Sequence, residues 1–362
     1  MNPSDPLAAA RAVLPRFSIP GDPVALAPFQ RGHIHDTLVS TFRTPQGRHR
    51  YLHQRINERV FTDVEALMHN VLEVTRHLET RGEMTAGGLH VLRLVPTREG
   101  GSYLRHESGC WRTYDFIEDT ESFDRCVGPE QAYEAASAFG RFQACLRELD
   151  PAALRITIPH FFSAPHRLAQ LDAARAAAVP ERLAASAVEL AFVEERRALV
   201  EVFDRLLADG RIPHRIVHGD TKLNNVLFDR RSGRAVSVVD LDTCMPAWSL
   251  YDFGDLVRFA AATCAEDERD LSLAGVDLDL YRALAEGYLA HAGAFLTPAE
   301  REHMPLAARL VTFMLGMRFL TDYLAGDVYF KTSRPDHNLD RARVQLTMVA
   351  QMEARAAEMM VA

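Results

Sequence analysis

The chain lacks several features that would assign it to a class of protein at once. Its 362 residues include five cysteines, and none of them forms a CxxC pair, so neither a zinc cluster nor a disulfide framework is indicated. No apolar run approaches the roughly 20 residues needed to cross a bilayer. The first residues lack the basic and apolar segments of a secretory signal. We therefore expect a cytoplasmic protein that does not span a membrane.

An excess of positive charge is also missing. The chain has 41 Lys and Arg residues against 49 Asp and Glu residues, which gives a formal net charge of −8. Because nucleic-acid binding depends largely on neutralising phosphates, this balance argues against a nucleic-acid partner. Aromatic residues make up only 8% of the chain and show no evident cluster, so an aromatic cage for a choline-like cation is not expected. A basic pocket for one small phosphate is still compatible with this composition.

What is present is the pattern of a two-lobed α+β protein. A chain of 362 residues exceeds a single small core, so two lobes are the natural expectation. The N-terminal part predicts a small antiparallel sheet with one helix. The expected order is strand, strand, helix, strand, strand, at residues 36–43, 50–57, 60–81, 89–95 and 111–117. Later stretches rich in Ala, Leu, Arg and Glu predict helices at 130–148, 164–208, 277–293, 299–325 and 337–360. We place the lobes at 1–117 and 118–362.

A β-rich island at residues 215–242 interrupts the helical pattern and carries the clearest chemistry. Two strand-like runs around a Ser-Gly turn predict a hairpin. A turn centred between Ser232 and Gly233 sets Asn225 opposite Asp240, within reach of each other across the pair. An amide oxygen and a carboxylate suit Mg²⁺, which also holds substrate phosphates. Asp242 is expected on the same strand face as Asp240, as a further candidate for metal or substrate binding.

Asp220 lies on the loop that enters this hairpin. A carboxylate five residues before a metal-binding Asn matches the catalytic loop of kinases, where the Asp accepts the proton of the attacking hydroxyl. For His218 we expect a packed, hydrogen-bonded role. The string Asp252-Phe253-Gly254 spells the metal-binding motif of protein kinases but ends no apolar strand. We therefore expect Asp252 and Asp255 to be structural, bonding backbone amides of the catalytic loop.

These residues belong to a longer series of strings through which the chain resembles the aminoglycoside phosphotransferase superfamily of kinases, and within it the N-acetylhexosamine 1-kinases. The strings are Gly32–Thr37, Gln54–Asn57, Trp111–Glu118, Asp220–Asn225, Asp240–Thr243, Arg318–Tyr323 and Gly326–Lys331. The resemblance implies a protein-kinase-like bilobal fold with ATP and Mg²⁺ between the lobes. It further implies phosphotransfer to a hydroxyl of a small molecule, here the anomeric 1-OH of an N-acetylhexosamine or related sugar.

The resemblance also implies roles for individual residues. The expected nucleotide-binding residues are Gly32, His33 and Thr37 in a loop over the phosphates, Arg55 with Glu65 as its helix partner, and Tyr114, Phe116 and Ile117 at the hinge. Arg55 stands on the strand where kinases place a phosphate-binding Lys, and an arginine grips phosphate bidentately. The expected substrate-binding residues, besides Asp220, are Arg318, Asp322 one helical turn later, and Tyr329.

Three alternatives stay open at this level. One is a kinase for another alcohol or amino sugar, of aminoglycoside, homoserine or choline type. The second is a nucleotide-binding regulatory module without turnover, which the complete set of Asp220, Asn225 and Asp240 disfavours. The third is a metal-dependent hydrolase built on His218, Asp220 and Asp240, which would need further histidine ligands that the sequence does not supply. The sequence gives no indication of an oligomeric state.

Overall fold

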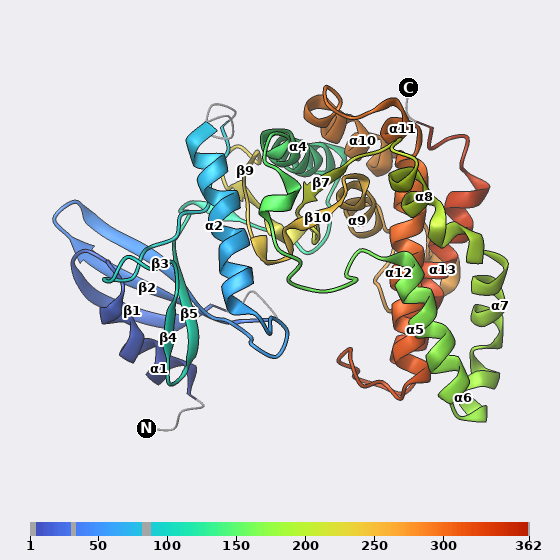
Figure 1. Cartoon of the computed structure of the whole chain (residues 1–362), viewed down its shortest axis with the longest axis horizontal. Coiled ribbons are helices and arrows are strands. Elements are labelled where there is room, and N and C mark those ends of the chain that lie inside the picture. Colours follow the sequence, from blue (N-terminus) through green and yellow to red (C-terminus); the bar gives the residue numbers. More distant parts are fainter. Residues whose placement is uncertain (1–4, 30–33, 82–87, 361–362) are drawn as a thin grey trace.

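The computed structural model describes residues 5–29, 34–81 and 88–360. It has two lobes, an N-terminal sheet and a larger part made mainly of helices (Figure 1). Helix α2 (Val64–Arg81) stands between them. The α+β organisation predicted from the sequence, with a small antiparallel sheet followed by a helical lobe, is confirmed.

The N-terminal lobe is built on a five-stranded antiparallel sheet with the order β1-β2-β3-β5-β4. The strands are β1 (Asp22–Pro28), β2 (Asp36–Thr44), β3 (Gly47–Arg55), β4 (Leu104–His106) and β5 (Gly109–Asp115). Strands β2 and β3 form the predicted hairpin, with Asp36 opposite Arg55. Helix α1 (Pro6–Val13) packs its Ala10 and Val13 against Phe42 and Trp111 of the sheet. This small core fixes β3 beside β5, which matters for the cavity described below.

One predicted strand of this lobe is wrong. Residues 89–95 form only isolated bridges, His90 with Ser237 and Leu94 with Tyr114, and the edge strand is β4 instead. A short apolar run cannot by itself distinguish a strand from an extended segment packed on a core. Leu89 and Leu92 are buried in this second way.

Helix α2 joins the two lobes. It begins just after Asp63, whose side chain accepts the Ala66 N–H at 2.9 Å and so caps the helix. Its apolar face, with Leu67, Met68 and Val71, belongs to the same core as the helices of the C-terminal lobe. The division of the chain after residue 117 therefore stays a prediction, because this core extends into α2.

The C-terminal lobe contains the remaining elements. Its helices are α4 (Pro129–Leu146), α5 (Ala164–Ala177), α6 (Pro180–Ala185), α7 (Ala187–Glu195), α8 (Val202–Ala208), α9 (Leu250–Ala260), α10 (Leu278–Ala292), α11 (Pro298–Glu302), α12 (Met304–Leu324) and α13 (His337–Ala354). Its strands are β6 (Thr120–Glu121), β7 (His214–Val217), β8 (Val226–Asp229), β9 (Ala235–Val238) and β10 (Met245–Trp248). The predicted stretch 164–208 is broken into four helices, since Pro180 cannot continue α5 and starts α6 instead.

Helix α12 is long and apolar enough to cross a membrane by length and composition alone. In the structure 67% of its most apolar window is buried. It lies against α13, α9 and α5, so it is a central helix of the C-terminal lobe (Figure 1). Its apolar character is explained by this packing.

The hairpin β8–β9 exists, but its predicted register is wrong by one residue. Val226 pairs with Val238, and a bulge between Leu227 and Phe228 shifts the pairing toward the turn. Asn225 consequently lies opposite Val239, whose N–H donates to the Asn225 carbonyl at 2.9 Å. Asp240 follows the strand with φ of 64° and opens the short 3₁₀ turn Leu241–Thr243. Asp242 therefore does not share a strand face with Asp240.

Candidate active site

Asp220 sits between β7 and the turn before β8, and its neighbours define its charge. Asn225 donates from Nδ2 to the Asp220 carbonyl at 2.8 Å and to Asp220 Oδ2 at 3.0 Å. Lys222 Nζ lies 2.8 Å from the same carboxylate oxygen. Burial alone would raise the pKa of Asp220, but the charge of Lys222 and these hydrogen bonds bring it below the usual value. The carboxylate is thus ionised at neutral pH and held in one orientation.

The loop around Asp220 is fixed from helix α9. The Asp252 carboxylate accepts the backbone N–H groups of His218 and Gly219, each at 2.8 Å. Asp255 accepts the Thr221 N–H at 2.9 Å. The expectation that both carboxylates are structural and bond this loop is confirmed. They act as fixed acceptors for amides that would otherwise be buried without partners.

His218 and Gly219 show why the loop needs these residue types. The His218 ring is fully buried between Phe139 and Phe142, and its Nε2 lies 2.9 Å from the Val239 carbonyl, so the predicted packed role is confirmed. Gly219 has φ of +81°, and a Cβ there would lie 2.7 Å from the Thr243 carbonyl oxygen. Only glycine fits this turn.

A cavity of about 430 Å³ opens between the lobes beside this loop. Its size lies within the range of small-molecule and cofactor sites. Residues predicted for the nucleotide or metal site contribute to its wall, namely Thr37, Tyr114, Phe116, Ile117, Asn225 and Asp240. The structure therefore brings together side chains that are far apart in the sequence. Gly32 and His33 lie outside the described residues.

Asn225 and Asp240 are the residues at this cavity that fit a divalent cation. Asn225 uses its Nδ2 to hold Asp220, which leaves its amide oxygen as an acceptor. Burial, followed by the charges of Asp242 and Asp220, raises the pKa of Asp240 to about 6. A buried carboxylate near other acids is the environment that a Mg²⁺ ion would neutralise. Within the described ranges no group of three or more His, Cys, Asp and Glu could hold a metal, so water and phosphate oxygens would complete its shell.

Both carboxylate oxygens of Asp242 bond residues of the N-terminal lobe. Its two oxygens bond Arg112, at 2.5 Å to Nη1 and 2.8 Å to Nη2, and Oδ2 also meets His35 Nε2 at 2.5 Å. Against the effect of burial, these partners hold the pKa of Asp242 far below its usual value. The metal or substrate contact of Asp242 stays a prediction. In the structure the turn Leu241–Thr243, which follows the left-handed Asp240, directs the Asp242 side chain toward the N-terminal lobe.

The predicted pair of Arg55 and Glu65 does not form. Arg55 Nε donates to Asp36 at 2.8 Å, and Arg55 does not line the cavity. Glu65 is exposed in the first turn of α2, where it pairs with Arg155 at 3.5 Å. The predicted pairing of Arg55 with Glu65 is therefore wrong. Side chains alternate between the two faces of a strand, and in β3 it is Leu52 and Gln54 that face the cavity.

Sequence reasoning missed other residues at the site. Lys222 could have been found from its place two residues after Asp220. Arg112 could have been found as a charged residue in the otherwise apolar run that begins at Trp111, since such a residue is seldom buried without a task. His35 and Gln54 carried no comparable signal.

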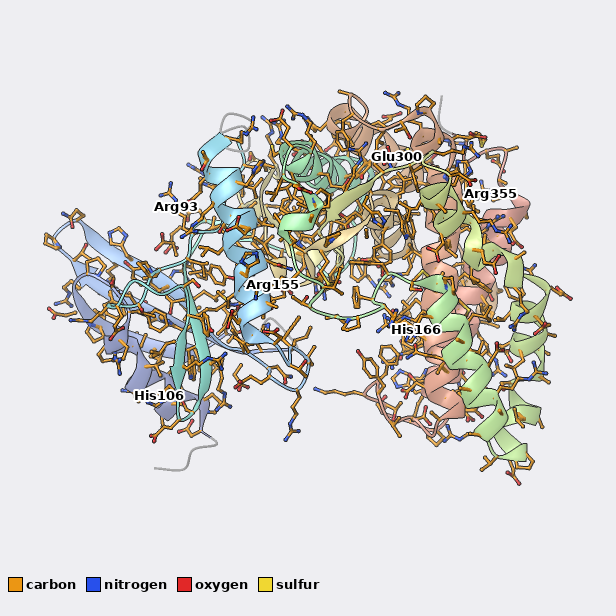
Figure 2. The ribbon with its side chains drawn as sticks, in the orientation of Figure 1. Arg93, His106, Arg155, His166, Glu300 and Arg355 are labelled. Atoms are coloured by element: carbon orange, nitrogen blue, oxygen red, sulfur yellow. The ribbon has the colours of Figure 1, made fainter. Side chains whose placement is uncertain are left out.

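Two arginines, Arg167 of α5 and Arg318 of α12, lie near each other and near Tyr251 of α9. The rings of Tyr329 and Phe330 lie 5.9 and 5.4 Å from the Arg318 guanidinium carbon, measured to the ring centroids. Burial and the nearby charge of Arg318 lower the pKa of Arg167, at the start of α5. His166, the residue before it, lies on the side of α5 that faces the N-terminal lobe (Figure 2). The predicted residues Arg318 and Tyr329 therefore do come together.

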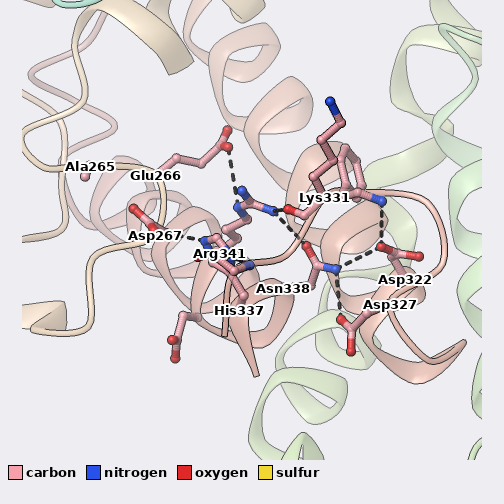
Figure 3. A network of polar contacts seen from close by, with 12 residues as sticks. Ala265, Glu266, Asp267, Asp322, Asp327, Lys331, His337, Asn338 and Arg341 are labelled. Atoms are coloured by element: carbon pink, nitrogen blue, oxygen red, sulfur yellow. Dashed lines mark hydrogen bonds and ion pairs between the residues drawn. The ribbon is translucent and has the colours of Figure 1, made fainter. Parts of the chain in front are cut away.

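Asp322 has a different role from the predicted substrate contact. Its carboxylate accepts the backbone N–H groups of Val328, Tyr329 and Phe330 at 2.8–2.9 Å and Asn338 Nδ2 at 2.8 Å (Figure 3). Asn338 also donates to Asp327 at 2.9 Å. Asp322 is 4% exposed, so its lone pairs are occupied inside the protein. It shapes the loop that carries Tyr329.

Comparison with known proteins agrees with this geometry. The family model described as the phosphotransferase enzyme family matches residues 28–311. Among solved structures, the microcompartment-associated aminopropanol kinase is 16% identical with a TM-score of 0.63, covering 98% of this chain and 99% of that one. An aminoglycoside phosphotransferase from Alicyclobacillus acidocaldarius is 16% identical with a TM-score of 0.61, covering 96% of each chain. A spectinomycin phosphotransferase in complex with ADP and spectinomycin is 12% identical with a TM-score of 0.50, covering 97% of this chain and 98% of that one.

The likeness to these structures confirms the protein-kinase-like fold, and the family match covers well over half of the chain. Together with the loop of Asp220, Lys222 and Asn225 beside an interlobe cavity, it establishes the class of enzyme: this chain belongs to the phosphotransferase enzyme family and is a small-molecule phosphotransferase that acts on a hydroxyl group.

Proposed function

We propose that the protein transfers the γ-phosphoryl group of ATP to a hydroxyl of a neutral small molecule, namely the anomeric 1-OH of an N-acetylhexosamine or a related sugar. The observation that carries the choice of acceptor is the charge of the region formed by Arg167, Arg318 and Tyr329, which we call the acceptor region. Among the described residues, no carboxylate bonds either guanidinium.

The acceptor region lies next to the catalytic loop. The ring of Phe162 approaches Gly219 so closely that a Cβ there would be 2.8 Å from Phe162 Cζ. Phe162 in turn packs on Tyr251 with ring centroids 4.6 Å apart. Burial raises the pKa of the Tyr251 hydroxyl, and the nearby charges of Arg318 and Arg167 act in the opposite direction. These contacts support the proposal that a molecule bound at the arginines offers a hydroxyl to Asp220.

The same charge argues against amine acceptors. A choline-like or aminopropanol-like cation needs carboxylates or an aromatic cage, whereas it would meet two uncompensated guanidinium groups here. Sugar hydroxyls and an acetamide carbonyl offer oxygen acceptors, which suit arginine, a side chain that only donates. A kinase of aminoalcohols is the competing function, and the likeness of the fold to the aminopropanol kinase does not distinguish the two.

In the proposed reaction the adenine lies in the interlobe cavity near Phe116 and Ile117, and the phosphates point toward Asn225 and Asp240. Asn225 and Asp240 would hold Mg²⁺, which supplies neutralisation of phosphate charge and alignment of the β- and γ-phosphates. Asp220 accepts the proton of the acceptor hydroxyl as its oxygen attacks the γ-phosphorus in line with the departing ADP. Lys222, at 2.8 Å from Asp220, keeps a positive charge beside the transferred group.

An assay of ADP release tests this function. The panel contains hexoses and N-acetylhexosamines, with aminoglycosides, choline and aminopropanol as amine-bearing competitors. We expect ADP release to depend on a neutral sugar and to be strongest with an N-acetylhexosamine. If an amine is the best acceptor, the proposed choice of substrate is wrong. If no acceptor in the panel stimulates the release of ADP, the proposed sugar-kinase function is wrong as a whole.

A matched pair of variants tests the acceptor region itself. We expect Arg318→Leu to raise the KM for the sugar about tenfold or more, since a hydrogen bond from a charged donor contributes roughly 1.5–3 kcal/mol. Arg282→Leu serves as the control, because Arg282 is exposed and pairs with Asp279 on α10 rather than with a residue of the acceptor region. The KM for ATP should stay unchanged in both variants. An equal KM for the sugar in Arg318→Leu and wild-type protein contradicts the assignment.

A further inference from the structure

Strand phase decides which cations of the N-terminal sheet face the interlobe cavity. Leu52 and Gln54 of β3 point into it, and on β5 the residue paired with Gln54 is Arg112, which lines it as well. Arg50 lines the hinge end, where it bonds Glu118 and packs over Phe116. Arg112 is thus a cation of the sheet that lines the same end of the cavity as Asp240. Against the effect of burial, the negative charge of Asp240 is among the influences that raise the pKa of Arg112.

Arg112 is buried and held in one geometry. It is 1% exposed, its Nε donates to Gln54 Oε1 at 3.0 Å, and both terminal nitrogens donate to Asp242. A guanidinium has five N–H groups, so three are engaged and two are left. One of these contacts the Met68 sulfur, 3.9 Å from Nη1, which is a weak acceptor.

The acid that holds Arg112 comes from the other lobe. In kinases the phosphate-binding cation of the sheet is paired with a glutamate of the neighbouring helix. Here helix α2 presents Met68 to Arg112, and its Glu65 lies at the exposed first turn. Asp242, from the turn Leu241–Thr243, takes the place of that glutamate across a sequence distance of 130 residues.

Asp242 holds a second element of the N-terminal lobe in the same way. The His35 ring accepts the Asn57 N–H at Nδ1 (3.0 Å), so its Nε2 carries the hydrogen and donates to Asp242. The ring also stacks on Phe61 with centroids 5.6 Å apart. His35 precedes β2, so one buried carboxylate ties both the start of this strand and Arg112 to the C-terminal lobe.

We propose that Arg112 binds the phosphates of the nucleotide, and that Asp242 is its positioning residue, an anchor across the two lobes rather than a ligand of the metal. This inference rests on the proposed use of ATP. It assigns Arg112 the task first expected of Arg55, and Asp242 the task first expected of Glu65. It leaves Asp240 as the carboxylate that faces the cation.

Equilibrium binding by isothermal titration calorimetry tests the inference without turnover. The full chain is titrated with ATP, ADP and adenosine in the absence of any acceptor. Because a charge-assisted hydrogen bond to phosphate is lost or weakened, we expect Arg112→Lys to bind ATP and ADP about tenfold or more weakly. Adenosine has no phosphate, so its affinity should be unchanged. The matched control is Arg55→Lys, which should bind all three ligands like the wild type.

Two further variants separate anchoring from metal binding and from misfolding. Asp242→Asn should weaken ATP binding while the Mg²⁺ concentration at half-maximal ATP binding stays the same, whereas Asp240→Asn should raise that concentration. The double variant R112M/D242N removes both buried charges together, so it leaves no unpaired charge. If Arg112→Lys does not fold, this double variant should show the same loss of ATP affinity. Melting curves without nucleotide establish which variants are folded.

The outcomes distinguish a failure of the Arg112 assignment from a failure of the proposed ATP-dependent function. If Arg112→Lys and the double variant bind ATP as tightly as the wild type, or if Arg55→Lys loses as much affinity, Arg112 is not the phosphate-binding cation. If Asp242→Asn raises the Mg²⁺ requirement, Asp242 is a metal ligand after all. A wild-type chain that binds neither ATP nor ADP would overturn the proposed function together with the inference.

Discussion

Asn225 holds Asp220 through two hydrogen bonds from a single amide, one to the backbone carbonyl at 2.8 Å and one to the carboxylate at 3.0 Å. This bond sets the carboxylate in place and leaves the amide oxygen of Asn225 free for a cation. The orientation of the base and the composition of the metal site are therefore coupled through one side chain.

The first prediction concerns the base. An Asp220→Asn variant keeps the shape of the side chain but cannot accept a proton, so kcat should fall by about 10²–10⁴. The affinity for ATP should hardly change, because Asp220 acts on the acceptor. Steady-state kinetics with the preferred sugar, together with calorimetry for ATP, gives both numbers. Near-normal turnover in this variant would refute the base assignment.

A second prediction concerns the support of the catalytic loop. The Asp252 carboxylate is 1% exposed and accepts two backbone N–H groups and Gln143 Nε2 at 2.7 Å. In Asp252→Asn an NH₂ group must face one of these donors, and the free energy of unfolding should drop by about 2–3 kcal/mol. Urea unfolding measures this loss. For comparison, Asp279→Asn on the exposed surface should change stability by less than about 0.5 kcal/mol; equal effects at the two sites would contradict the role of Asp252.

The acceptor loop gives a third prediction. Asp322 orders the backbone of residues 328–330 through three N–H groups. An Asp322→Asn variant keeps only part of these bonds, so the loop carrying Tyr329 should lose its fixed position and the KM for the acceptor should rise about tenfold. The KM for ATP is the internal control, because the cavity does not include this loop. A parallel rise in both values would point to a general loss of folding instead.

The fourth prediction is a pH dependence of stability that arises from His53. This side chain is 1% exposed between Ser40 and Thr113, and burial lowers its pKa to about 3. The unfolded chain titrates near pH 6.5, so stability is complete above that value and is lost as the pH falls from about 6.5 toward 3. The loss should reach about 2 kcal/mol by pH 5.

A His53→Gln variant tests this directly, since glutamine can bond both hydroxyl groups and does not titrate. Its stability at pH 8 should be close to or below that of the wild type, whereas the decrease between pH 7 and pH 5 should be about 2 kcal/mol smaller. Urea unfolding at the three pH values measures the difference. An unchanged slope would assign the acid sensitivity to other groups.

Several parts of this protein follow from the sequence because they are local. The spacing of Asp220 and Asn225, the hairpin of β2 and β3, the Asp63 cap of α2 and the apolar face of that helix each depend on residues close together in the chain. Periodicity and short-range hydrogen bonding determine such features. The packed role of His218 also follows, since it stands between an apolar strand and the loop.

The arrangement of charges around the cavity was decided only by the tertiary structure. A bulge of one residue in β8–β9 changed the register, and the left-handed Asp240 ended the strand, so that Asp242 lies in a turn and not on a strand face with Asp240. The phase of β3 put Gln54 rather than Arg55 toward the cavity, and the pairing of β3 with β5 placed Arg112 there. Side chains on a strand alternate faces, so a shift of one residue reverses every assignment. Which acid then meets Arg112 depends on how two lobes dock, and no local pattern in the chain encodes that contact.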